Sequence, residues 1–277
     1  MNFAVLNPDN MRRVPHVRIA GIPAAVVSEL GLAKLMSDDC SRFRAGLLRR
    51  PVTVMDVNGQ AVSLFARDPD YARALESASI VHADGQFLVT FSRFCSRKIP
   101  ERTATTDFIH AAAQKAQDDG LSFYLLGGEE GIARECADRL KELYPNLQVA
   151  GYRSGYFSEE EEESVIEEVN ASGADIVWVG LGKPKEQLFV SKNRSKLHCA
   201  WVVTCGGCFN FITGDYSRAP KWMQAAGMEW IHRMLTGPRY LLTRYLTTVP
   251  HALWLTLYWM IAGRNEASVE FDQKKEI

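Results

Sequence analysis

The chain has 277 residues, of which 47% are hydrophobic and 23% are charged, and its formal net charge is -1 at pH 7. This length and composition are those of an ordinary globular protein that buries a full core in one large or two small domains. The near-zero net charge argues against a nucleic-acid partner bound over the whole surface.

Short apolar runs alternate along the chain with amphipathic stretches of helical period. Helices are predicted at 69–77, 132–143 and 158–169, the last with Ser158 as its N-cap and acidic residues in its first turns. Strands are predicted at 17–20, 52–55, 80–83, 123–126, 147–150, 176–179 and 201–204. This alternation is typical of an α/β fold, in which helices flank a parallel sheet.

Chemically distinctive residues follow several of these strands. Because ligands bind such sheets at the carboxyl ends of the strands, we expect the motifs there to form one site. They are Asp84-Gly85, Gly127-Gly128, residues 180–184 and residues 205–208. Asp84 can act as a general base with Gly85 admitting a substrate, or the pair can form a plain turn.

The glycine pairs Gly127-Gly128 and Gly180-x-Gly182 each lie between a strand and a helix. Backbone N–H groups at such a junction favour phosphate, although an ordinary turn explains the glycines equally well. Neither pair completes a dinucleotide fingerprint, so no cofactor is expected. Lys183, Lys185 and Gln187 follow, where they can contact a diphosphate, sugar or base, or simply begin a helix.

Two further patterns are better explained by structure than by a metal. The Cys205-x-x-Cys208 pair follows a buried strand without a second such pair, so we interpret these thiols as buried and inert. Asp68-Pro69-Asp70 resembles a metal-binding D-x-D, but an N-cap followed by proline at the first helical position explains it. With six irregularly spaced cysteines and no signal-peptide pattern in residues 1–10, we expect a reducing, cytoplasmic environment.

The C-terminal part combines arginines with aromatic residues. Arg218, Arg233, Arg239 and Arg244 each lie within a few residues of an aromatic side chain. The apolar run at 252–262 is too short to span a bilayer, which needs about 20 apolar residues. It predicts either a helix lying in the membrane interface or a helix that docks on its own domain or on a second subunit.

Taken together, these motifs resemble the WecG/TagA/CpsF glycosyltransferases from about residue 17 to residue 245. The matching segments occur in the family's order, at 79–85, 101–103, 124–128, 144–152, 155–157, 174–182, 184–185, 218–220, 229–230 and 233. The resemblance implies a Rossmann-like core over residues 1–235 and a membrane-associating helical appendage over 236–277.

The same resemblance implies an inverting, metal-independent enzyme on the inner face of the cell membrane. It would move a sugar from a UDP-sugar to a polyprenyl-diphosphate-linked saccharide in surface or exopolysaccharide synthesis. Asp84 would be the general base, and Arg233, Arg239 and Arg244 would neutralise the departing diphosphate. Substrate binding is expected from Asn58, Gly85, Arg102, Gly127, Gly128, Gly182, Lys185, Gln187 and Arg218.

Some positions depart from the family's usual residues. They are Asp56, the 104–106 segment, the Glu186-Gln187 order and Asn210. These departures leave the donor sugar open between N-acetylmannosamine-type and glucose-type donors. The alternative function is a non-catalytic partner that binds a nucleotide sugar or a lipid carrier within an assembly complex.

Overall fold

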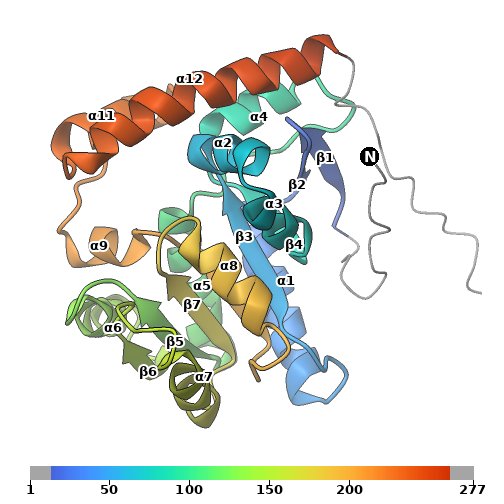
Figure 1. Cartoon of the computed structure of the whole chain (residues 1–277). Helices are drawn as coiled ribbons and strands as arrows, with labels where there is room; N and C mark the ends of the chain where they lie inside the picture. Colours follow the sequence, from blue (N-terminus) through green and yellow to red (C-terminus); the bar gives the residue numbers. More distant parts are fainter. Residues whose placement is uncertain (1–13, 263–277) are drawn as a thin grey trace, which may run out of the picture.

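The computed structural model describes residues 14–262, which form an α/β core crossed by C-terminal helices (Figure 1). The core contains a six-stranded, all-parallel sheet in the order β4-β3-β8-β7-β5-β6. Its strands are β3 (Val52–Val57), β4 (Ile80–Ala83), β5 (Ser122–Gly127), β6 (Gln148–Arg153), β7 (Ile176–Gly180) and β8 (Trp201–Thr204). The predicted α/β fold with a parallel sheet is therefore confirmed.

The helices divide between the two faces of the sheet. Residues of α1 (Glu29–Arg44), α5 (Thr105–Asp119), α6 (Ile132–Leu143) and α9 (Cys208–Thr213) share one apolar cluster with the sheet. The opposite cluster contains residues of α2 (Gly59–Arg67), α3 (Pro69–Glu76), α4 (Gln86–Ser92), α7 (Glu162–Ala171) and α8 (Lys185–Asn193). Every residue of β3, β4, β5, β7 and β8 is buried, as expected for strands covered on both faces.

One predicted strand is present but lies outside the parallel sheet, and one predicted helix cap was wrong. The strand predicted at 17–20 is β1 (His16–Ile19), but it pairs with β2 (Ile22–Ala25) in a separate antiparallel hairpin. Ser158 does not cap the helix after it, because α7 begins only at Glu162. The Ser158 hydroxyl instead accepts a hydrogen bond from the Glu161 N–H, so it stabilises a turn before the helix.

Three helices follow the core at the C-terminal end. They are α10 (Lys221–Ala225), α11 (Glu229–Thr236) and α12 (Tyr240–Ile261), and α12 runs along the top of the molecule in Figure 1. Within the described residues, no helix is long and apolar enough to cross a membrane. Residues 263–277 of the expected appendage lie outside the described part.

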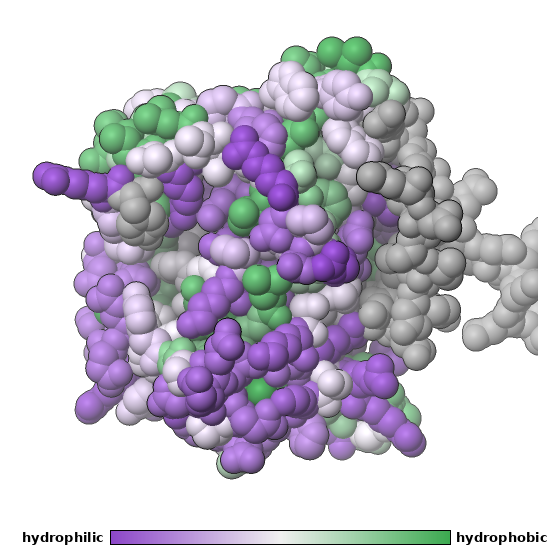
Figure 2. All heavy atoms as spheres, viewed as in Figure 1, coloured by the Kyte–Doolittle hydropathy of each residue, from purple (hydrophilic) through white to green (hydrophobic). Residues whose placement is uncertain are grey.

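The two sides of α12 have different surroundings. Leu241, Tyr245 and Ala252 are buried, and the helix packs on α2 and β1. Trp259 joins the same apolar cluster and lies against Gly21 of the β1–β2 turn. The outer side exposes Leu242, Leu246, Trp254, Leu257, Tyr258 and Ile261. Figure 2 shows hydrophobic atoms along this upper edge, whereas the lower part of the same face is largely hydrophilic.

Candidate active site

The carboxyl ends of the strands open into two cavities that adjoin each other. The larger has a volume of about 550 Å³ and lies over the loops that follow β3, β4, β5, β7 and β8. The smaller, of about 230 Å³, lies between the start of α4 and helices α11 and α12. Both are lined by Asn58, Gln60, Asp84, Arg102, Glu229, Arg233 and Arg244. The predicted strand-end motifs therefore meet in one place, and Asp84 lies where the cavities join.

Local structure holds the Asp84 carboxylate from two sides. Asn58 is the N-cap of α2, and its Oδ1 accepts hydrogen bonds from the N–H groups of Gln60 and Ala61. This fixes the amide so that Nδ2 donates to Asp84 Oδ2 at 3.2 Å. From the other side, the Thr105 N–H at the start of α5 donates to Oδ1 at 3.4 Å. A helix N-terminus favours negative charge, so α5 stabilises the ionised form.

Cations also surround Asp84. Arg102 Nε donates to the Asp84 carbonyl oxygen at 2.6 Å, and Arg102 Nη2 lies 3.8 Å from Asp84 Oδ1. Burial alone would raise the pKa of Asp84, but Arg102, Lys183 and the Asn58 amide outweigh it and lower the pKa. Asp84 is therefore a carboxylate at neutral pH, which is the form that accepts a proton.

The loops after β5 and β7 approach so closely that glycine is required. A Cβ on Gly127 would lie 2.4 Å from the carbonyl oxygen of Gly180. Gly128 lines the larger cavity, and its N–H donates to that same Gly180 oxygen. Gly182 also lines it, with a φ of +75° that side-chain-bearing residues rarely adopt. These glycines shape the wall, and Gly127 itself lies just behind it.

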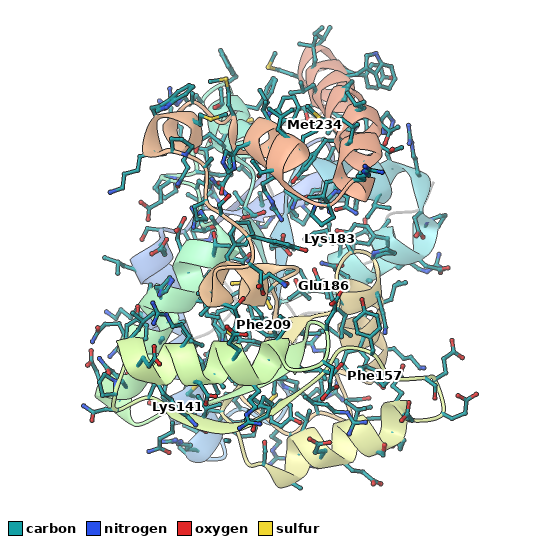
Figure 3. The ribbon with its side chains drawn as sticks, turned by 90° about the vertical axis from the view of Figure 1, so that its left-hand side faces the viewer. Lys141, Phe157, Lys183, Glu186, Phe209 and Met234 are labelled. Carbon is teal, nitrogen blue, oxygen red and sulfur yellow. The ribbon has the colours of Figure 1, made fainter. Side chains whose placement is uncertain are left out.

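The floor of the larger cavity contains a buried charge cluster. Lys183 forms ion pairs with Asp56 and Glu186, and its side chain is only 5% exposed. Burial would lower the pKa of Lys183, but the two carboxylates outweigh it and raise the pKa. Figure 3 shows Lys183 and Glu186 between Met234 of α11 and Phe209 of α9. Lys183 is therefore neutralised by two carboxylates of the protein, and its ammonium group is not free to pair with a diphosphate in this structure.

Glu186 joins the loops that follow β7 and β8. Its Oε2 accepts hydrogen bonds from the N–H groups of Gly182 at 3.0 Å and Gly206 at 2.9 Å. Gln187 is completely buried behind it and donates to Glu186 Oε1 and Thr204 Oγ1. Gln187 lines neither cavity, so in this structure it supports Glu186, and its expected contact with a substrate stays a prediction.

The predicted arginines occupy different places. Arg233 and Arg244 line both cavities and lie over the rings of Phe211 and Tyr245, respectively. Among residues 14–262, neither guanidinium forms an ion pair with a carboxylate. Arg239 is exposed at the N-cap of α12 and lines neither cavity. The structure thus brings two of these three arginines to Asp84.

Arg218 is occupied by the protein itself. Its guanidinium binds Asp107 through two nitrogens and donates to Thr106, Gln224 and Glu229. These bonds use Nε, Nη1 and Nη2, and Arg218 lines neither cavity. The arginine thus joins the first turn of α5 to α10 and α11, and its expected contact with a substrate stays a prediction. Lys185 lines the larger cavity, where its Nζ donates to the Gly155 carbonyl oxygen.

The two patterns with a metal-like spacing have structural roles. Cys205 and Cys208 are free and buried, and burial raises the pKa of both thiols, as expected for inert cysteines. Asp68 caps α3 by accepting hydrogen bonds from the N–H groups of Asp70 and Tyr71. The described residues contain no group of three or more His, Cys, Asp or Glu side chains arranged to hold a metal ion.

The sequence agrees with this architecture. The model of the glycosyl transferase WecG/TagA/CpsF family matches residues 17–266. The chain belongs to this glycosyltransferase family. The WecG/TagA/CpsF match includes the whole of α11 and α12, so both cavities and all the residues that line them lie inside the matched region.

Sequence reasoning missed several residues of this candidate site. Glu229 was visible only as part of a matching Glu-Trp pair, and nothing in its spacing showed that it binds two arginines. The apolar wall of the smaller cavity was missed because its members come from distant segments: Phe87, Trp230, Tyr245, Val249 and Leu253. Helical spacing in α12 placed Tyr245, Val249 and Leu253 on one side, but their neighbour α4 could not be inferred.

Proposed function

We propose that the protein is an inverting glycosyltransferase that takes a sugar from a UDP-sugar and places it on a polyprenyl-diphosphate-linked saccharide. The larger cavity would hold the donor, with its glycine loops around the nucleotide sugar. The smaller cavity would admit the acceptor, with its apolar wall toward the lipid. The observation that carries this proposal is the position of Asp84 where the two cavities join, together with Arg233 and Arg244, which line both cavities and form no ion pair with a carboxylate among the described residues.

In the proposed reaction, Asp84 accepts the proton of an acceptor hydroxyl. The hydroxyl oxygen attacks the anomeric carbon from the side opposite UDP, so the bond to the β-phosphate oxygen breaks and the configuration inverts. The bonding electrons leave with the diphosphate. Arg233 and Arg244 would offset the negative charge that develops there, which is the electrostatic task that a divalent cation performs at other sites.

Membrane association is part of the same proposal. The outer side of α12 exposes the stacked rings of Trp254 and Tyr258, and Trp254 also stacks with His251, which contacts Ser63 of α2. Tryptophan and tyrosine favour the membrane interface, and α12 lies above the smaller cavity. We propose that this helix lies on the inner face of the cell membrane and delivers a lipid-linked acceptor to that cavity.

Asp84→Asn tests the proposed reaction. A general base contributes about 10²–10⁴-fold, so turnover should fall by that factor while the folded structure is retained. The measurement is UDP release from a panel of UDP-sugars with a short, water-soluble lipid-diphosphate acceptor, and circular dichroism checks folding. Turnover near that of the wild type would contradict the role of Asp84. Binding of a UDP-sugar without any turnover in the wild type would instead favour the non-catalytic partner.

A further inference from the structure

Glu229 occupies the first position of α11, where its carboxylate binds two arginines from other parts of the chain. Oε2 accepts a hydrogen bond from Arg102 Nη1 at 2.6 Å, and Oε1 accepts one from Arg218 Nε at 3.0 Å. Only 7% of Glu229 is exposed. Removing one partner of a buried ion pair leaves an uncompensated charge in the interior, which strongly destabilises the folded protein.

The same arginine that binds Glu229 also binds Asp84. Arg102 donates to the Asp84 carbonyl oxygen, and its Nη2 lies 3.8 Å from the Asp84 carboxylate. Arg102 is thus closer to the carboxylate of Glu229, at 2.6 Å, than to that of Asp84. Asp84, Arg102 and Glu229 form a line of alternating charge across the boundary between the core and α11.

This line of charge acts on the base strength of Asp84. A guanidinium beside a single carboxylate stabilises its ionised form and so weakens it as a base. Glu229 offsets part of the Arg102 charge, which limits that weakening. The other titratable groups near Asp84 are Lys183, which Asp56 and Glu186 neutralise, and His82, in which burial lowers the pKa and so favours the neutral ring. Arg233 and Arg244 line the same cavities.

Resting on the proposed role of Asp84 as the base, we propose that Glu229 is a positioning residue that sets its base strength through Arg102. Glu229 also fixes α11, since Arg218 ties the same carboxylate to Asp107 in the first turn of α5. Arg233 lies one helical turn after Glu229. The Glu229 carboxylate therefore links Asp84 in the core, through Arg102, to the helix that carries Arg233.

Glu229→Gln in the full-length chain tests this inference, because it preserves side-chain size and removes only the charge. The pKa of Asp84 should fall further, since the Arg102 charge is no longer offset. We expect kcat with the water-soluble acceptor to fall roughly 3- to 10-fold. The acid limb of the kcat/KM profile should move about one unit lower, and the donor KM should stay within about twofold.

Three comparison variants make the result specific. Glu130→Gln makes the same chemical change at an exposed position outside both cavities, and should leave the profile unchanged. Arg102→Gln should move the acid limb in the opposite direction, because the cation is lost. If Glu229→Gln does not fold, Glu229→Asp is the test: its shorter carboxylate should produce a smaller shift in the same direction.

Two outcomes separate this inference from the proposed function. An unmoved acid limb and unchanged kcat in folded Glu229→Gln, with Asp84→Asn inactive, would overturn the role of Glu229 and leave Asp84 as the base. Full activity of Asp84→Asn would overturn the proposed function itself. A purely structural role for Glu229 would lower thermal stability and kcat without moving the acid limb, and that result also overturns the inference.

Discussion

The two cavities that meet at Asp84 are built in different ways. The larger is formed by loops at the ends of parallel strands, where the sheet holds the backbone and glycines allow the loops to approach. The smaller is formed by side chains from α4, α11 and α12, which are far apart in the sequence. The shape of the larger cavity therefore depends on the sheet, whereas the shape of the smaller one depends on how the C-terminal helices dock.

Charge is also distributed differently between them. In the larger cavity, the Lys183 cation is neutralised within the floor by Asp56 and Glu186. At the boundary with the smaller cavity, Arg233 and Arg244 have no carboxylate partner within the described part of the chain. Of these three cations, only the two junction arginines therefore remain available to an anionic ligand, whereas Lys183 is already neutralised.

Replacing both junction arginines should have the largest effect after Asp84→Asn. In Arg233→Ala/Arg244→Ala, we expect kcat with the water-soluble acceptor to fall by about 10²-fold or more, the loss typical of removing one preorganised donor. Steady-state UDP release is the measurement. Arg239→Ala is the matched control, because Arg239 is exposed and lines neither cavity. Equal losses in the control and the double variant would show that only general basic charge matters.

A pair of single changes should separate donor from acceptor binding. Glu186→Ala removes the carboxylate that accepts hydrogen bonds from the N–H groups of Gly182 and Gly206. Because hydrogen bonds to a charged group are lost, these loops should be held less firmly and the donor KM should rise about tenfold. Leu253→Ser lies in the smaller cavity and should raise only the acceptor KM, by a few-fold. Initial rates with each substrate varied check both. If each variant changes both KM values equally, the two cavities do not bind separate substrates.

The smallest effect on chemistry is expected at the outer side of α12. Trp254→Ser/Leu257→Ser should weaken binding to vesicles containing anionic phospholipid about tenfold, because less apolar surface enters the interface. Activity with the water-soluble acceptor should stay within about twofold. Flotation of protein with vesicles measures binding, and Leu143→Ser on α6 is the control for an exposed leucine. Unchanged vesicle binding with a loss of self-association would favour contact with a second subunit.

Much of the core could be predicted because its signals are local. The strands at 80–83 and 201–204 and the helix at 132–143 agree with the structure to the residue. The cap at Asp68 also followed from its own neighbours. Arg218 and Gln187 show the limit. Both are of residue types that bind substrates, but tertiary contacts occupy Arg218 and bury Gln187. Hydrogen-bonding capacity is visible in a sequence, whereas its partners are not.

The sequence by itself determined the parallel α/β core, the strand-end motifs and the family, because hydrophobic period and motif order are properties of neighbouring residues. Only the tertiary structure decided that Glu229 and Arg233 line the same cavities as Asp84, that Arg239 does not, and that α12 packs one side on the core. The physical reason is that these contacts join segments more than a hundred residues apart. Their geometry depends on how the packed helices settle against the sheet, which no local pattern records.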